Sequence, residues 1–275
     1  MRAMPGPFVS FLTDFGTDAT APAVCRGVIL GICPEARIVD LTHAVTRQDV
    51  GEGAFLLWSA VPHLPVGVHL AVVDPGVGTA RRGVAVRAAR GDLLVGPDNG
   101  LLRPAVERLG GLVAAHALTE PRLWKHPVSS TFHGRDVFAP VTAHLAHGEP
   151  LSAVGETLDP GELVDLRLPQ ATARDGGLDT GVVFVDTFGN CRLAGDLGEL
   201  QAAVGAITDG DGFHVQMGSN QAEMPYHATF GQVAAGQALL YEDADYAGLG
   251  LAINHGSAAD SFGMAAGSAV RIERR

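Results

Sequence analysis

The sequence predicts two domains: an N-terminal α/β domain with a layered, largely parallel sheet, and a smaller all-β C-terminal domain, either a barrel or a sandwich. Strand-like and helix-like segments alternate through the first half of the chain. The largely apolar run Val68–Val73 is typical of a strand covered on both faces. After Leu168 the apolar runs become short and are separated by Gly and Asp, which is typical of a small β domain.

Residues 1–168 form the predicted α/β domain, which carries the candidate catalytic loops. Pro22 stands at a permitted early position of the first helix. Asp49 is a candidate N-cap of the second helix. The predicted strands are Phe8–Leu12, Ile38–Leu41, Val68–Val73, Gly83–Arg87 and Leu93–Val95. The predicted helices are Pro22–Cys33, Asp49–Ala60, Leu101–Leu109 and Val137–Ala146.

The rest of the chain is predicted to be a linker and a β domain. Residues 169–179 are polar and rich in Gly, so they are assigned to the linker. Residues 180–275 form the predicted β domain. Its apolar runs are Val182–Val185, Ala203–Ile207, Phe213–Met217, Ala238–Tyr241, Leu249–Ile253 and Ala269–Ile272.

The overall composition excludes several classes of protein. The chain is 47% hydrophobic and has a formal net charge of −11 with no cluster of Lys and Arg, so a nucleic-acid partner is not expected. The longest apolar runs are too short to cross a bilayer, and the N-terminus lacks the features of a signal peptide, so no membrane partner is expected. Three cysteines form no CxxC pair, which favours a reducing, cytoplasmic location.

Two loops that follow predicted strands carry candidate functional carboxylates. In open α/β sheets, ligands bind at the carboxyl ends of the strands. Asp14, in the loop after the first strand, can accept hydrogen bonds from a ribose diol, or it can form a structural Asx-turn. Asp74 and Arg81 bracket a Gly-containing loop and can meet as a charge-assisted pair, with a purely structural salt bridge as the alternative.

Two further loops complete the candidate site. Gly96–Gly100 contains an Asn-Gly turn signal and is interpreted as a structural turn beside the site. His133 lies in the dense cluster Ser130–Asp136, where Asp136 is the predicted N-cap of the next helix. His43 follows a strand and is a further candidate for the same site. His144 and His147 have helical spacing suited to a metal, but the sequence shows no third ligand.

Taken together, these loops resemble the S-adenosylmethionine hydroxide adenosyltransferase family, which is related to fluorinases and chlorinases. The resemblance covers nearly the whole chain, in order. Each motif is weak alone, whereas seven in register are specific. The matching segments are Leu12–Gly16, Asp40–His43, Val72–Thr79, Gly96–Leu102, Thr131–Asp136, Asp186–Asn190 and Asn254–Ala259.

The resemblance implies a fold and a reaction. The family combines an α/β domain with a β-barrel and forms homotrimers, with S-adenosylmethionine bound between the first domain of one subunit and the second domain of its neighbour. Its hydrolases use an Asp-Arg-His set that corresponds to Asp74, Arg81 and His133, whereas halogenating relatives have Tyr at the Asp74 position. The implied reaction is attack of water on the ribose C5′, giving adenosine and methionine, with no cofactor and no metal.

The resemblance also implies binding roles. Asp14 is expected to hold the ribose hydroxyls, Phe132 to pack near the adenosyl group, and Asn190 to bind adenine. Asp186 is expected to face the methionine ammonium. The backbone from Asn254 to Ser257 is expected to line the adenine edge.

The sequence departs from the family pattern at the positions expected to hold the methionine end of the substrate. Ala19 and Ala21 replace a carboxylate and a small or aromatic residue, and Asp245 replaces a Ser. These changes leave open whether S-adenosylmethionine or another adenosyl sulfonium is the substrate. The alternatives to a hydrolase are a halogenase that makes a 5′-halo-adenosine, a non-catalytic adenosine-binding or S-adenosylmethionine-binding module, and a metal-dependent hydrolase.

Overall fold

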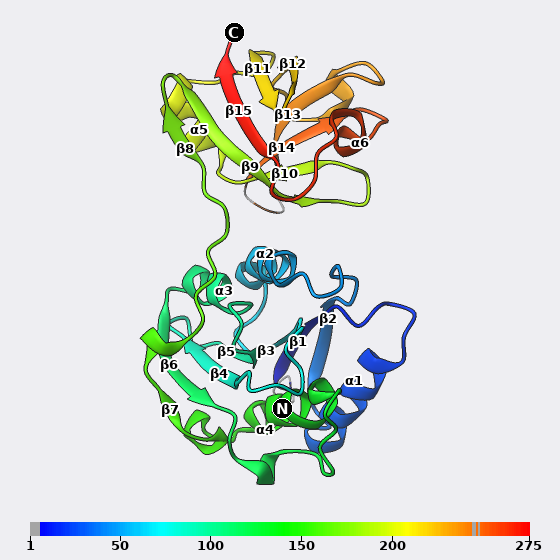
Figure 1. Cartoon of the computed structure of the whole chain (residues 1–275), viewed down its shortest axis with the longest axis vertical. Helices are drawn as coiled ribbons and strands as arrows, with labels where there is room; N and C mark the ends of the chain where they lie inside the picture. The colour runs from blue at the N-terminus through cyan, green and yellow to red at the C-terminus, as the bar shows by residue number, and fades with distance from the viewer. Residues whose placement is uncertain (1–5, 244–245, 247) are drawn as a thin grey trace, which may run out of the picture. The chain divides into compact units, whose positions relative to one another are not determined.

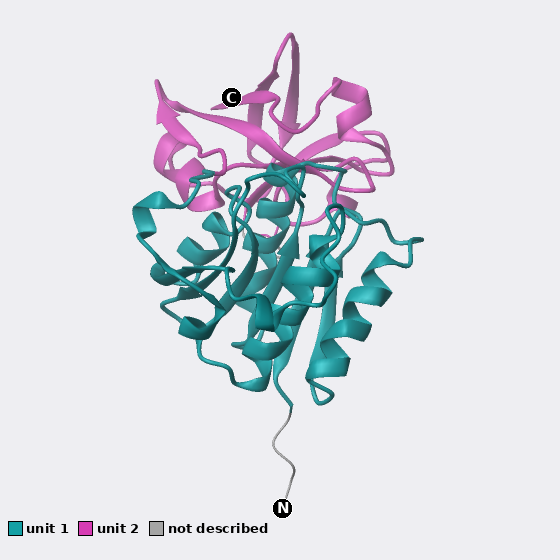
Figure 2. Cartoon of the chain, turned by 60° about the horizontal axis from the view of Figure 1, so that its bottom comes forward, with its two compact units in different colours: residues 1–167 teal, residues 168–275 magenta. Residues whose placement is uncertain are grey.

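The computed structural model describes residues 6–243, 246 and 248–275 (Figure 1). The chain divides into two compact units, Met1–Arg167 (unit 1) and Leu168–Arg275 (unit 2), which are coloured separately in Figure 2. Unit 1 is an α/β unit and unit 2 is a β unit, so the predicted fold class is confirmed. No helix in the described part of the chain combines the length and the apolar character needed to cross a membrane.

The described part of unit 1 contains a seven-stranded mixed sheet in the order β2-β1-β3-β5-β4-β6-β7. β1 pairs in parallel with β2 and β3, and β3 pairs in parallel with β5. β4, β6 and β7 are added through antiparallel pairs. The strands are β1 (Phe8–Thr13), β2 (Arg37–Thr42), β3 (Val68–Val72), β4 (Gly83–Ala88), β5 (Leu93–Pro97), β6 (Leu112–Ala117) and β7 (Thr157–Leu158).

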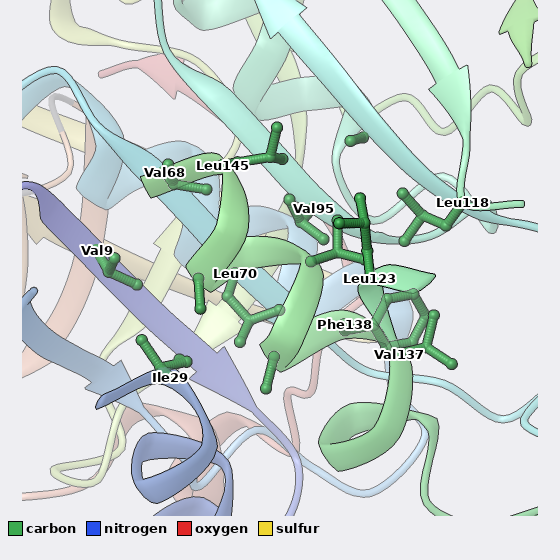
Figure 3. Packing of buried hydrophobic residues seen from close by; sticks show 14 of the residues in the cluster. Val9, Ile29, Val68, Leu70, Val95, Leu118, Leu123, Val137, Phe138 and Leu145 are labelled. Carbon is green, nitrogen blue, oxygen red and sulfur yellow. The ribbon is translucent and has the colours of Figure 1, made fainter. Parts of the chain in front are cut away.

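Helices cover the sheet of unit 1 and bury its central strands. α1 (Ala21–Ile32) and α4 (Ala139–His147) pack against each other, and α2 (Val50–Ala60) packs against α3 (Arg103–Arg108). Val9 and Leu70 join Ile29 of α1 and Leu145 of α4 in one apolar cluster (Figure 3). Every residue of β1 and β3 is buried, which explains why these strands lack a polar alternation.

Local signals in the sequence predict some features of unit 1 and fail to predict others. The Asp49 carboxylate accepts a hydrogen bond from the Glu52 backbone amide at 2.9 Å, so the predicted N-cap of α2 is confirmed. The sequence does not predict β6, because its LVAAHA run has three alanines and no clear alternation. Pairing with β4, a non-local partner, decides the conformation of β6.

The described part of unit 2 contains an eight-stranded sheet of antiparallel neighbours that curves into a nearly closed barrel. The order is β12-β11-β15-β9-β10-β14-β13, with β8 paired to β9. A parallel bridge between Tyr226, which directly follows β12, and Leu240 of β13 connects the two ends of this order. The strands are β8 (Thr172–Arg174), β9 (Gly177–Val185), β10 (Cys191–Leu193), β11 (Gly212–Met217), β12 (Asn220–Pro225), β13 (Ala238–Asp243), β14 (Gly248–Ile253) and β15 (Ala269–Arg274).

Two predictions for unit 2 need correction. The run Ala203–Ile207 is not a strand, because α5 (Leu197–Val204) occupies its first residues and starts with a capping box between Asp196 and Glu199. The stretch 169–179 is not simply a linker, because the β8–β9 hairpin begins within it. Asp175 and Gly176 form the hairpin turn with φ of 49° and 73°, the conformation that Asp-Gly favours in a two-residue turn.

Candidate functional site

The candidate catalytic residues lie on loops at the carboxyl ends of the parallel strands in unit 1. Asp14 directly follows β1, and Asp74 follows β3 by two residues. The Asn99 amide, just after β5, donates to the Val73 carbonyl at 2.8 Å and ties the neighbouring loop to the same edge. His133 comes from much later in the chain, immediately before the helical run that leads into α4.

Asp74 and Arg81 form a bidentate ion pair across their loop, as the sequence predicts. Arg81 Nε donates to one carboxylate oxygen at 3.0 Å, and Nη2 donates to the other at 2.5 Å. The side chains are only 6% and 10% exposed. A forked arrangement of this kind fixes the orientation of the carboxylate as well as its charge.

His133 joins this pair through its Nδ1 atom, which lies 3.2 Å from Arg81 Nη2. A guanidinium can only donate, so Nδ1 accepts and the neutral ring carries its proton on Nε2. Burial lowers the pKa of His133, and the positive charge of Arg81 lowers it further. The imidazole is therefore a neutral group that presents an N–H at Nε2.

The Asp74 carboxylate keeps its basicity although it is paired. Burial raises the pKa of Asp74, and the charge and hydrogen bonds of Arg81 offset this only in part. Among the three groups, Asp74 combines a negative charge with a raised pKa, whereas His133 already accepts a hydrogen bond at Nδ1. This asymmetry makes Asp74 the stronger candidate for a proton acceptor.

Two glycines allow the loops to approach each other. Gly78 has φ +75°, and a Cβ on it would lie 2.3 Å from the Ser130 carbonyl oxygen. A Cβ on Gly134 would lie 2.8 Å from the Phe15 ring. The Phe15 and Phe132 rings meet edge to face with centroids 5.8 Å apart, so Phe132 packs beside the loop that carries Asp14.

The structure corrects the predicted role of Asp136, which is not the N-cap of an α-helix. Residues Gly134–Phe138 form a π-helical turn that leads into α4. The buried Asp136 carboxylate accepts from the Ser129 amide at 2.9 Å and from Arg135 at 2.6 and 2.8 Å. Asp136 therefore holds the loop that carries His133 in place.

Asp14 is held at the end of β1 by neighbouring loops. Its Oδ2 atom accepts from the backbone amide of Gln48 at 2.9 Å. The preceding Thr13 hydroxyl is hydrogen-bonded to His43 Nδ1 at 2.8 Å and accepts from the Phe15 amide at 3.2 Å. His43 is 8% exposed, and burial lowers its pKa. The hydrogen bond between His43 and Thr13 thus holds the start of the loop that carries Asp14.

In unit 2, the predicted binding residues gather on the loops around β10 and β14. Asp186 accepts from the Phe188 and Asn190 amides, both at 2.9 Å, and from the Asn190 side chain at 2.9 Å. A Cβ on Gly189 would lie 2.1 Å from Ser257 Oγ, so the Asp186 loop and the Ser257 loop are in direct contact. The structure therefore brings Asp186, Asn190 and Ser257 together within one unit.

Asn254 and Ser257 also have structural partners. The side-chain amide of Asn254 donates to the Val233 carbonyl at 2.8 Å. Ser257 is the N-cap of α6 (Ala258–Phe262) and accepts from the Asp260 amide at 3.1 Å. These bonds hold the backbone between the two residues in a defined position, which fits a role in which the backbone contacts a ligand.

Arg192 belongs to the same group and was not predicted from the sequence. Its Nη2 atom lies 3.3 Å from Asp186, and its Nη1 atom contacts both Asp243 and the Tyr241 hydroxyl. Its guanidinium also lies 4.6 Å from the centre of the Tyr246 ring. A charged residue between Cys191 and Leu193 in a short apolar strand is the signal that could have revealed it.

The residues that depart from the family pattern have different positions. Ala19 is exposed, and Ala21 is the first residue of α1. Asp18 is also exposed, beside Gly16. Asp245 lies outside the described residues.

Comparison with known proteins gives one consistent result. Residues 9–155 match the SAM hydroxide adenosyltransferase N-terminal domain, and residues 180–271 match the corresponding C-terminal domain. The chain is 44% identical over 268 residues to an (R)-S-adenosyl-L-methionine hydrolase of Salinispora tropica, covering 98% of both chains. It is 29% identical to a fluorinase of Actinopolyspora mzabensis, covering 98% of this chain and 97% of the fluorinase. A crystal structure of an uncharacterized conserved protein from Thermotoga maritima superposes with a TM-score of 0.91 at 32% identity, covering 97% of this chain and all of that one.

Proposed function

The chain belongs to the SAM hydroxide adenosyltransferase family, and from this premise we propose that it hydrolyses S-adenosyl-L-methionine to adenosine and L-methionine. The observation that carries the proposal is the contact of Arg81 with both Asp74 and His133, because it joins a carboxylate and a neutral imidazole at one point. A halogenase is the less supported alternative, since the fluorinase relative is more distant than the hydrolase relative.

The reaction is an in-line displacement at the ribose C5′. Water forms the new C5′–O bond while the C5′–S bond breaks, and the sulfonium sulfur keeps the electron pair and leaves as the neutral thioether of methionine. Asp74 accepts the proton that the water loses. A positioned base of this kind contributes roughly 10²–10⁴-fold to a rate.

Arg81 and His133 position the water and its base. The bidentate contact with Arg81 holds Asp74 in one orientation. Because His133 accepts from Arg81 at Nδ1, its Nε2–H is available to donate to the oxygen of the attacking water. Correct alignment of the reacting atoms supplies much of the remaining acceleration. The sulfonium is already a good leaving group, so we assign no cofactor and no metal to this reaction.

We assign the binding roles from the family resemblance and from the placement of each residue. Asp14 holds the ribose hydroxyls, and Phe132 packs near the adenosyl group. Asn190 and the backbone from Asn254 to Ser257 bind adenine. Asp186 faces the methionine ammonium, next to Arg192.

We propose a homotrimer as the active assembly, with each substrate bound by unit 1 of one protomer and unit 2 of its neighbour. Analytical ultracentrifugation checks the trimer. Mixing an Asp74→Asn chain with an Asn190→Ala chain checks the shared site, because mixed trimers should regain activity. We also propose a cytoplasmic location, in keeping with three buried cysteines that form no disulfide.

Chromatography of the purified protein with S-adenosyl-L-methionine tests the proposed function. Adenosine and methionine should appear in equal amounts, without dependence on chloride, fluoride or a chelator. Both sulfonium epimers should be assayed separately, since the Salinispora relative is named for the (R) epimer. A 5′-halo-adenosine product would indicate a halogenase. Tight adenosine binding by calorimetry without turnover would indicate a binding module.

The pH profile should identify Asp74 as the base. Burial raises the pKa of Asp74 and lowers that of His133. Asp74 acts only when ionised, so kcat should be constant at neutral pH and fall as the pH drops through a value above the ordinary aspartate value of about 3.9. The measurement is kcat against pH for the wild type, Asp74→Asn and His133→Gln. An acid limb that persists in Asp74→Asn and vanishes in His133→Gln would assign the base to His133.

Asp186→Asn should weaken binding of the amino-acid end of the substrate. Hydrogen bonds to a charged group contribute about 1.5–3 kcal/mol, so KM for S-adenosylmethionine should rise by roughly 10–100-fold. The KM of a dimethylsulfonium analogue of adenosine, which lacks the amino acid, should barely change. Asp209→Asn is the matched control, because Asp209 also lies in a loop of unit 2 and accepts from a backbone amide and side chains. An equal rise in KM for both substrates would contradict the assigned role.

A further inference from the structure

Three side chains that can bind a metal meet at the ends of α1 and α4, among residues to which the proposed reaction gives no role. They are Cys33, Glu35 and His147, and one ligand atom from each lies within 4.8 Å of the others. The sequence pairs His147 only with His144 and shows no third ligand. The fold instead brings His147 to the turn between α1 and β2, which supplies a thiol and a carboxylate.

We propose that Cys33, Glu35 and His147 bind one Zn²⁺ ion. Thiolate, imidazole and carboxylate are the three donor types that zinc uses in proteins, at about 2.0–2.3 Å from the metal. The thiolate and the carboxylate together carry two negative charges, which match the charge of the ion. Three protein ligands leave the fourth tetrahedral position to water.

The backbone around this cluster also favours a cation. Cys33 is the C-cap of α1, and its amide donates to the Ile29 carbonyl at 2.8 Å. α4 ends at His147, where Gly148 adopts φ +110° and donates to the Leu145 carbonyl at 3.1 Å. α1 and α4 pack side by side (Figure 1), so two helix C-termini, each with partial negative charge, meet at the cluster.

The ligands combine one rigid position with two adaptable ones. Cys33 is 1% exposed and belongs to the same apolar cluster as Ile29 and Leu145, so packing fixes its thiol. Glu35 and His147 are exposed, and their side chains can rotate to complete the coordination. Such a site can close on an ion without rearrangement of the core.

The cluster lies at the edge of the sheet opposite the proposed catalytic residues. α4 starts after the turn that carries His133 and runs about 13 Å to His147. β2 starts at Arg37, so Glu35 lies at the amino end of the strands, whereas Asp14 and Asp74 lie at the carboxyl ends. The ion therefore ties the α1–β2 turn to α4 and takes no part in the reaction.

Titration of the reduced, metal-free protein with Co²⁺ and then Zn²⁺ tests the site. One equivalent of Co²⁺ should produce tetrahedral d–d bands and a thiolate-to-metal charge-transfer band, and Zn²⁺ should displace it. Cys33→Ser should remove the charge-transfer band. His147→Gln and Glu35→Gln, both at exposed positions, should weaken binding by more than roughly tenfold, since even changes around a metal's ligands cost 10–100-fold.

Two matched variants control for general loss of thiol or imidazole. Cys191→Ser removes another buried thiol, and His144→Gln removes the histidine one turn earlier in α4; both should bind like the wild type. Zinc should raise the melting temperature of the wild type and of these controls, but not that of His147→Gln. Absence of saturable binding in the wild type, or binding that survives both Cys33→Ser and His147→Gln, would overturn the proposal.

Discussion

Asp74→Asn should lower kcat for adenosine formation by roughly 10²–10⁴-fold, the contribution of a positioned general base. The variant keeps the size of the side chain but loses the charge and the basicity. Arg81 loses its carboxylate partner, although it still reaches His133. Because the change acts on the attacking water, KM should change far less than kcat. Quantitative chromatography of adenosine and methionine measures the effect.

Asp98→Asn is the matched control for this variant. Asp98 accepts two hydrogen bonds from Arg82, at 3.1 and 2.8 Å, and its side chain is 5% exposed, close to the 6% of Asp74. Both substitutions thus remove a buried carboxylate that binds an arginine through two donors. Asp98→Asn should lose stability and keep turnover. Equal losses of kcat in the two variants would mean that Asp74 acts only through the structure of its loop.

Asp92→Ala should destabilise unit 1 by about 3–5 kcal/mol, the usual cost of removing one partner from a buried ion pair. Asp92 and His69 are both 0% exposed, and His69 Nε2 lies 2.9 Å from the carboxylate. Arg90 contacts the same carboxylate at 2.7 and 2.8 Å. Loss of Asp92 leaves both partners without their acceptor. Urea denaturation measures the cost.

The network around Asp92 should lose stability in acid. Burial opposes ionisation, but hydrogen bonds from Arg90 and His69 hold the pKa of Asp92 well below its usual range. Its contribution to stability is therefore complete above the unfolded-state value of about 3.9 and is lost as the pH falls below it. Asp92→Asn should lack this part of the acid sensitivity. Asp165→Ala is the exposed control for Asp92→Ala. It removes a 51% exposed carboxylate beside Arg167, and it should lower the free energy of unfolding by no more than about 1 kcal/mol.

Ser10 completes this network, but the network is not a second catalytic site. The Ser10 hydroxyl lies 2.8 Å from His69 Nδ1, so the three residues have the order of a serine-hydrolase triad. Ser10 is 0% exposed in the middle of β1 and cannot reach a substrate. Burial separates a structural triad from a catalytic one.

Local features of this protein could be predicted from the sequence. Asp49 caps its helix, and Asp74 meets Arg81, because each pair is separated by only a few residues of a short helix start or loop. The α/β and β units also follow from local patterns, since apolar runs and turn residues act within short windows. The seven motifs in register identified the family, although no single motif was specific.

Only the tertiary structure decided which distant residues meet. His133 reaches Arg81 across 52 residues, Arg192 reaches the Tyr241 hydroxyl across 49 residues, and His147 joins the turn that carries Cys33. β6 likewise depended on its pairing with β4. Short-range periodicity determines which face of an element is apolar, and many arrangements satisfy that requirement. Long-range pairing of strands and packing of helices select one arrangement, and with it the neighbours of each polar side chain.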